Sequence, residues 1–322
     1  MVRLPRWGGN GMSLTSKLTT IAAAGSGGVS GWYLAFRGSS VYDYAYSVKV
    51  DSSNDIYVGG FSRDSSLGAG YGAYMAKISP DAEFQWSKYY DVTTDRNYIE
   101  DFDLDGNGYI YTVGSINTTV EDIYTSKISA STGATVWVRK TSGNSIDRVK
   151  DCVWDSTNGY LVVAGTTYSL TNLTGAYWGY VTSTGGLVDY IQRGSFTNQF
   201  VDVCISGDAY YYVGFTSASG SSYGLIQSSL SNPSTSLRPR QADAGGSWVA
   251  CDGIGTSDAV VIGTSGGDQK VMRIASNLGQ LWRKNINFDP VSGLVEVCTD
   301  ASDNIYVLST GDSGFGVTKL DS

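Results

Sequence analysis

The stretch DIYVGG at 55–60 is the first of six related segments in this chain. The others are YIYTVG at 109–114, YLVVAG at 160–165, YYYVGF at 210–215, AVVIGT at 259–264 and NIYVLS at 304–309. They recur at intervals of about fifty residues, which is typical of proteins built from repeated structural units. The chain is therefore predicted to repeat one unit six times.

Each unit divides into four short segments of alternating apolar and polar residues, separated by clusters of Gly, Asn, Asp or Ser. In the first unit they are YSVKVD at 46–51, DIYVGG, YMAKIS at 74–79 and FQWSKYY at 84–90. This alternation indicates β-strands joined by tight turns. The Gly that ends the second segment is expected to let the backbone leave its strand. Four antiparallel strands repeated at this period predict the blades of a β-propeller.

The two ends of the chain favour a closed ring over a linear solenoid. The sixth unit stops after its third segment, 315–320, and GWYLAFR at 31–37 supplies the missing fourth segment. A ring that pairs its first strand into its last blade leaves no open sheet edge. The Trp of this segment, Trp32, takes the place held in other units by Trp86, Trp137 and Trp282. We expect an all-β fold, a six-bladed β-propeller of four-stranded antiparallel blades over 31–322.

Residues 1–30 precede the repeats and form a separate N-terminal arm. Within them, Leu14, Leu18 and Ile21 fall on one face of a possible helix, followed by a Gly- and Ser-rich hinge. A signal peptide is one interpretation, but the apolar part is short and rich in Thr. We expect an arm that binds a neighbouring protein chain.

The composition narrows the function classes. The net charge of −8 opposes binding to a phosphate backbone, so no nucleic acid partner is expected. No apolar run is long enough for a membrane-spanning helix. The absence of histidine removes Ser-His-Asp catalysis and the commonest zinc ligand. We expect no enzyme activity, no cofactor and no bound metal.

Two acidic patterns have alternative interpretations. The sequence DLDGNGYI at 103–110 matches the start of a calcium-binding loop, but Gly114 stands where the closing Glu belongs, so a hairpin turn is the simpler interpretation. Acid pairs eight residues apart either cap turns or form a ring that holds a cation or a sugar. These pairs are Asp43 with Asp51, Asp95 with Asp103 and Asp147 with Asp155.

Four cysteines lie one per unit in the last four units, at spacings that match no zinc motif. Small side chains on first strands are expected to be buried, and we predict packed free thiols rather than disulfides. These residues are Cys152, Cys204, Cys251 and Cys298.

A contact surface is predicted where the loops between second and third and between fourth and first segments gather. These loops are long and aromatic in the first two units, and Tyr and Arg are enriched where partners bind. The candidate residues are Tyr42, Tyr44, Tyr71, Asp95, Arg96 and Tyr98.

The motifs DSSNDIYVGGFS and MAKISPDAEFQWSKYY resemble the bacterial and phage β-propeller repeat family, over about residues 31–322. This resemblance implies a scaffold, as in tailed-phage virion proteins that contact other virion proteins or a host surface. SPDAEFQW at 79–86 is also similar to the Asp box of sialidases, in which that box is a structural turn. We expect a non-enzymatic virion component of the tail or capsid. The alternatives are a secreted or cell-surface glycan-binding propeller, and a propeller glycosidase or lyase.

Overall fold

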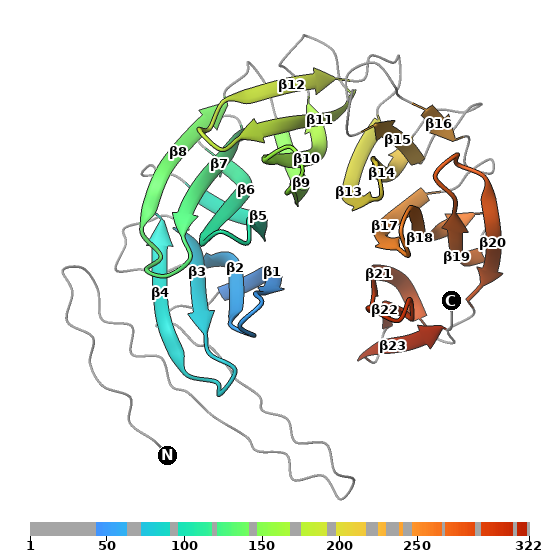
Figure 1. Ribbon diagram of the computed structural model, residues 1–322, viewed down its shortest axis with the longest axis horizontal. Coiled ribbons are helices and arrows are strands. Elements are labelled where there is room, and N and C mark those ends of the chain that lie inside the picture. Colours follow the sequence, from blue (N-terminus) through green and yellow to red (C-terminus); the bar gives the residue numbers. More distant parts are fainter. Residues whose placement is uncertain are drawn as a thin grey trace, which may run out of the picture. The chain divides into compact units, whose positions relative to one another are not determined.

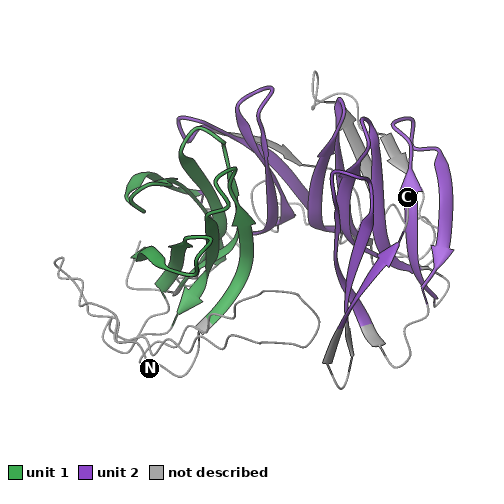
Figure 2. Cartoon of the chain, turned by 60° about the horizontal axis from the view of Figure 1, so that its bottom comes forward, with its two compact units in different colours: residues 1–140 green, residues 141–322 purple. Residues whose placement is uncertain are grey.

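A computed structural model describes most of the repeats, and within the described ranges the chain consists of strands and turns (Figure 1). The described residues are 43–62, 72–90, 96–117, 121–141, 147–167, 175–191, 198–216, 225–229, 238–240, 247–265, 268–286, 291–311 and 314–320. The chain divides into two compact units, 1–140 and 141–322, which are coloured separately in Figure 2.

The first unit contains two four-stranded sheets, each formed by consecutive strands in chain order. The first sheet consists of β1 (Asp43–Val50), β2 (Ile56–Ser62), β3 (Gly72–Ile78) and β4 (Phe84–Tyr90). The second sheet consists of β5 (Arg96–Leu104), β6 (Tyr109–Asn117), β7 (Glu121–Ser129) and β8 (Thr135–Thr141). Neighbouring strands β1 to β4 and β5 to β7 run antiparallel.

The second unit contains three four-stranded sheets and one of three strands. The third sheet consists of β9 (Asp147–Asp155), β10 (Tyr160–Thr167), β11 (Gly175–Thr182) and β12 (Leu187–Ile191). The fourth consists of β13 (Asn198–Ser206), β14 (Ala209–Thr216), β15 (Leu225–Ser229) and β16 (Arg238–Arg240). The fifth consists of β17 (Ser247–Ile254), β18 (Asp258–Ser265), β19 (Asp268–Ile274) and β20 (Gln280–Asn285). The sixth consists of β21 (Val291–Thr299), β22 (Ile305–Gly311) and β23 (Gly314–Leu320).

The prediction of four-stranded antiparallel sheets is confirmed, but the prediction of six complete blades is not. Five sheets are complete, and the sixth ends at β23, which pairs with β22 and with no second strand of the described ranges. The segment 31–37, predicted to complete this sheet, lies outside the described residues, as does the arm 1–30.

A β-bulge in the first strand of the sheets explains the Gly of the repeated segment. In the second sheet the register shifts between Ile99 and Asp101, and a Cβ added to Gly114 would lie 1.8 Å from the Tyr98 carbonyl oxygen. The same close approach occurs at Gly60, Gly165 and Gly214. Gly is therefore required because the bulged strand presses its backbone against β2, β6, β10 and β14, and not because the strand ends there as predicted.

The sixth sheet carries Ser309 where the other repeats have Gly. Its first strand has two register shifts instead of one, so the backbone approach differs from that of the other sheets. The Ser309 hydroxyl donates a hydrogen bond to the Gly316 carbonyl at 3.2 Å.

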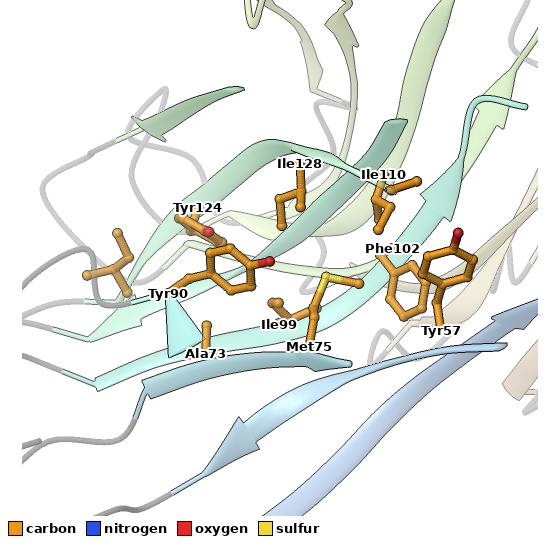
Figure 3. Packing of buried hydrophobic residues seen from close by; sticks show 11 residues of the cluster. Tyr57, Ala73, Met75, Tyr90, Ile99, Phe102, Ile110, Tyr124 and Ile128 are labelled. Atoms are coloured by element: carbon orange, nitrogen blue, oxygen red, sulfur yellow. The ribbon is translucent and has the colours of Figure 1, made fainter. Parts of the chain in front are cut away.

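Apolar side chains fill the space between successive sheets within each unit. In the first unit, Tyr57 and Met75 of the first sheet pack against Ile99, Phe102 and other residues of the second sheet (Figure 3). In the second unit, similar clusters join the third sheet to the fourth, the fourth to the fifth and the fifth to the sixth. These clusters arise because alternate residues of each strand face the same neighbouring sheet.

Candidate contact surface

Four aromatic side chains of the first unit form a cluster that we call the aromatic patch: Tyr44, Tyr46, Phe61 and Tyr98. The ring of Phe61 stacks on Tyr44 with centroids 4.9 Å apart and meets Tyr98 edge-on at 4.9 Å. Tyr46 lies 5.5 Å from the same Phe61 ring. The patch thus joins β1 and β2 of the first sheet to β5 of the second sheet.

The bulge of β1 sets which residue of β2 lies opposite Tyr44. Tyr44 pairs directly with Phe61 across the sheet, and the register shifts between Ala45 and Ser47. Tyr46 is the extra residue of the bulge, and its ring centroid lies 6.5 Å from that of Tyr44. Without the bulge Tyr44 would lie opposite Ser62, so this local irregularity is what pairs Tyr44 with Phe61.

Two of the four side chains of the patch are about half exposed to solvent. Tyr44 is 49% exposed and Tyr46 is 50% exposed, whereas Phe61 beneath them is buried. Partial burial raises the pKa of Tyr46, and the nearby Glu100 raises it further. Tyr46 therefore remains a neutral phenol near pH 7, able to donate or accept a hydrogen bond beside an apolar ring surface.

The structure brings together two of the predicted contact residues, Tyr44 and Tyr98. Arg96 begins β5, but its side chain lies outside what the structure describes. The other predicted residues also lie outside the described ranges, namely Leu14, Leu18, Ile21, Tyr42, Tyr71 and Asp95.

Sequence reasoning missed Tyr46 and Phe61. Tyr46 begins the predicted strand segment 46–51 and so falls outside the loops, although alternation places it on the same face as Tyr44, two residues earlier. Phe61 directly follows the Gly of the repeated segment, and the bulge that makes this position face Tyr44 leaves no pattern in the sequence. An aromatic residue after that Gly also occurs at Phe215, so it is a weak signal.

Acidic residues at the ends of first strands cap the following turns. Asp51 Oδ1 accepts the backbone N–H groups of Ser53 at 2.8 Å and Asp55 at 3.0 Å. Asp155 Oδ1 likewise accepts the N–H of Thr157 at 2.8 Å. The turn-capping interpretation is confirmed for these two acids.

The turn at 103–110 is a hairpin turn, as expected. Asp105, not Asp103, caps it, because Asp105 Oδ1 accepts the N–H groups of Asn107 at 2.8 Å and Tyr109 at 2.9 Å. Gly106 and Gly108 both have positive φ, which suits glycine.

The match to the Asp box is also a hairpin turn, between β3 and β4. The Ser79 N–H donates to the Glu83 carbonyl at 2.8 Å, and the Glu83 N–H donates to Ser79 Oγ at 3.1 Å. Ala82 of this turn adopts a positive φ of 64°.

Asp300 is the turn-capping acid of the sixth sheet and gives a testable dependence on pH. Hydrogen bonds from the Asn304 side chain and from the N–H groups of Asn304 and Ser302 lower the pKa of Asp300 to about 2. The unfolded value is about 3.9, so the ionised carboxylate stabilises the fold above about pH 4, and this contribution is lost as the pH falls towards 2.

We expect Asp300→Asn to lower the urea midpoint at neutral pH and the difference from the native chain to shrink between about pH 4 and 2. Urea unfolding at a series of pH values measures this, with Asp208→Asn in an exposed turn as the control. A difference that stays constant down to about pH 2 would contradict the assignment.

A second set of acids, missed in the sequence, joins neighbouring sheets of the second unit. Asp151 Oδ2 of β9 accepts the Val203 N–H of β13 at 2.8 Å. Asp202 Oδ2 of β13 accepts the Cys251 N–H of β17 at 2.6 Å. Asp252 of β17 continues the series to Thr299 of β21, at 2.7 Å. These first strands are therefore linked by carboxylates that accept backbone hydrogen bonds.

None of the four cysteines forms a disulfide, as predicted. Cys152, Cys204 and Cys251 are buried, as predicted, whereas Cys298 is exposed, so the prediction of a packed thiol is wrong for Cys298. Burial raises the pKa of the Cys298 thiol, and Asp252, Glu296 and Asp300 add to this effect. Cys298 is therefore not an activated nucleophile.

The described residues contain no group of three or more acidic or sulfur side chains placed to hold a metal ion. Over the same ranges, no helix is long and apolar enough to cross a membrane.

The sequence matches no protein-family model and no curated protein, but the fold is similar to solved structures. One is the major allergen Mala s 1 of Malassezia sympodialis, with 13% identity, a TM-score of 0.55 and coverage of 86% of this chain and 92% of that chain. Another is the β-propeller domain of the Trilobed protease of Pyrococcus furiosus, with open velcro topology, at 9% identity, a TM-score of 0.56 and coverage of 91% and 84%.

A third similar structure belongs to the outer coat vertex of COPII on membranes, with 12% identity, a TM-score of 0.56 and coverage of 82% of this chain and 69% of that chain. At these identities the similarity concerns the fold. The resemblance to a propeller repeat family is thus supported for its architecture and not for a phage origin. This chain has an all-β propeller fold built mostly from four-stranded antiparallel sheets.

Proposed function

We propose that this chain is a non-enzymatic structural component of a tailed-phage virion, in which the propeller serves as a rigid platform for other proteins. The aromatic patch is the observation that carries the proposal, because two half-exposed tyrosines lie over a buried Phe61. Aromatic side chains held in this way are typical of residues that contribute most to protein interfaces. The acids Asp51, Asp155 and Asp202 accept backbone hydrogen bonds, which favours a structural role for them.

Two further elements belong to this proposal. The arm 1–30 binds another virion protein through Leu14, Leu18 and Ile21, and the segment 31–37 completes the sixth sheet as a sixth blade. The similar propeller fold in a COPII coat supports a platform role by analogy of fold.

The double variant Tyr44→Ala/Tyr46→Ala tests the contact surface. Both side chains are about half exposed, so the fold should persist while affinity for the partner falls about tenfold or more. Quantitative mass spectrometry of purified virions should find the native chain at fixed stoichiometry and the variant depleted.

Tyr160→Ala is the matched control, because Tyr160 is an exposed tyrosine of the second unit, at 37%. It should enter particles normally.

A chain lacking residues 1–28 should fold but fail to assemble. Undiminished incorporation of the double variant would remove the patch from the proposal, and absence of the native chain from virions would remove the virion role.

A cell-surface or secreted glycan-binding propeller is the second candidate. The half-exposed ring of Tyr44, stacked on the buried Phe61 ring and inclined to it by 20°, presents a flat face on which a sugar ring can lie. Binding to a glycan array that is lost in the double variant, with no chain found in virions, would favour this function.

A further inference from the structure

Two of the free thiols lie together between the fourth and fifth sheets. Cys204 of β13 is 6% exposed and Cys251 of β17 is 5% exposed, and both belong to the apolar cluster that joins these sheets. Within this cluster the Cys251 thiol forms a hydrogen bond with the sulfur of Cys204. Two thiols of neighbouring sheets are therefore in direct contact, with no disulfide between them.

The backbone around this pair holds the two strands close to each other. Cys204 pairs with Tyr211 of β14, and the Cys251 thiol donates a hydrogen bond to the Tyr211 carbonyl oxygen at 3.5 Å. The Cys251 N–H donates to Asp202 Oδ2 at 2.6 Å, two residues before Cys204. At this point β13 and β17 lie side by side (Figure 1), and the thiol pair spans the same gap as the carboxylate.

The neighbouring interfaces of the second unit show that packing alone does not require a thiol at these two positions. The strand registers give the corresponding residues when they are counted from the Gly of each second strand, or from Ser309 in the sixth sheet. An apolar side chain of similar size serves at most of these positions. The corresponding residues are Val153 and Val203 between the third and fourth sheets, and Asp252 and Val297 between the fifth and sixth.

We propose that Cys204 and Cys251 form a redox site, in which a peroxide joins the two thiols into a reversible disulfide that ties the fourth sheet to the fifth. The thiols are already in contact, so rotation of their side chains can bring the sulfur atoms to the bonding distance of about 2 Å. This site does not depend on the platform role proposed above.

Cys204 is the sulfur that reacts first. Burial raises the pKa of both thiols, but the hydrogen bond from Cys251 lowers the pKa of Cys204 and so favours its thiolate. This thiolate attacks one oxygen of hydrogen peroxide, which forms a sulfenic acid and releases hydroxide. The Cys251 sulfur then attacks the sulfenic sulfur and displaces its oxygen. The two thiol protons leave in water, and two electrons pass from the sulfur atoms to the peroxide.

The burial of the pair favours a small oxidant. Hydrogen peroxide can reach a buried sulfur through local opening of the sheets, and a dithiol reductant reverses the bond by exchange. The disulfide should therefore form when the protein passes from reducing to oxidising surroundings. It adds a covalent bond to an interface that the apolar cluster and Asp202 already hold together.

Treatment of the full chain with hydrogen peroxide tests the site, in a Cys298→Ser background that removes the exposed thiol. Peptide mapping without reductant should find Cys204 linked to Cys251, and dithiothreitol should restore both thiols. The oxidised chain should unfold at a urea concentration higher by about 0.5 M or more, because the disulfide restricts the unfolded chain.

Cys251→Val in the same background is the matched control, because Val203 and Val297 occupy this position in the neighbouring sheets. It should fold, and peroxide should not raise its urea midpoint. Thiols at 204 and 251 that stay free, oxidise singly or link to Cys152 would overturn the proposal. A linked chain that is no more stable than the reduced chain would also overturn it.

Discussion

Gly114→Ala is expected to lower the free energy of unfolding by about 3 kcal/mol or more, because the new methyl group cannot be accommodated. Its Cβ would lie 1.8 Å from the Tyr98 carbonyl oxygen and 2.8 Å from the carbonyl carbon. Both atoms belong to the backbone of the bulged strand β5, so relief requires β5 to separate from β6. Flexible side chains could move aside, but a paired backbone cannot do so without losing hydrogen bonds.

Urea unfolding followed by circular dichroism measures this effect, and Gly293→Ala is the matched control. Gly293 also lies in a bulged first strand, but a Cβ there would meet nothing within 4 Å. The control should change stability by no more than about 0.5 kcal/mol. Equal stability of Gly114→Ala and the native chain would show that the bulge is not as described.

Asp202→Ala is expected to lower the free energy of unfolding by about 1–3 kcal/mol, because the Cys251 N–H loses its carboxylate acceptor. Asp202 Oδ2 accepts the Cys251 N–H at 2.6 Å, and Oδ1 accepts the Val203 N–H at 2.6 Å. Val203 follows Asp202 in β13, whereas Cys251 belongs to β17 of the next sheet, so the bond to Cys251 is the one that links the two sheets. Asp202→Asn keeps one acceptor oxygen and should cost less than the alanine variant.

Asp208→Ala provides the control for this comparison, because Asp208 lies in the exposed turn after β13. In thermal and urea unfolding, Asp202→Ala should be the least stable of the three variants, Asp202→Asn intermediate and Asp208→Ala the most stable. If Asp202→Ala matched Asp208→Ala, the carboxylates would not link the sheets as inferred.

Much of the fold follows from the sequence, since alternation and turn residues specify local structure. The predicted segments 84–90 and 280–285 correspond to β4 and β20 within a residue. The bulges could not be predicted, because they depend on how closely two backbones approach each other. Their only trace in the sequence is the Gly at positions such as Gly114. The prediction that the repeated Gly lets the backbone leave its strand was therefore wrong, although the position of this Gly marks the bulge.

The candidate site was predicted less completely than the fold. Tyr44 and Tyr98 were found because aromatic residues gather near long loops, whereas Phe61 lies within β2 and faces Tyr44 only because of the bulge. The acids Asp151 and Asp202 also recur at intervals of about fifty residues, but their role depends on contacts between sheets. Side chains that act across sheets cannot be identified from spacing within one strand.

Hydrogen exchange of the β23 amides tests most directly whether the repeat is completed by the segment 31–37. In an edge strand, alternate N–H groups point away from the single partner and exchange fast, whereas a strand with two partners protects consecutive groups. We expect slow exchange at consecutive residues across 316–319 in the full chain, measured by NMR. Alternating slow and fast amides there would show that β23 is an open edge and would contradict the six-bladed account.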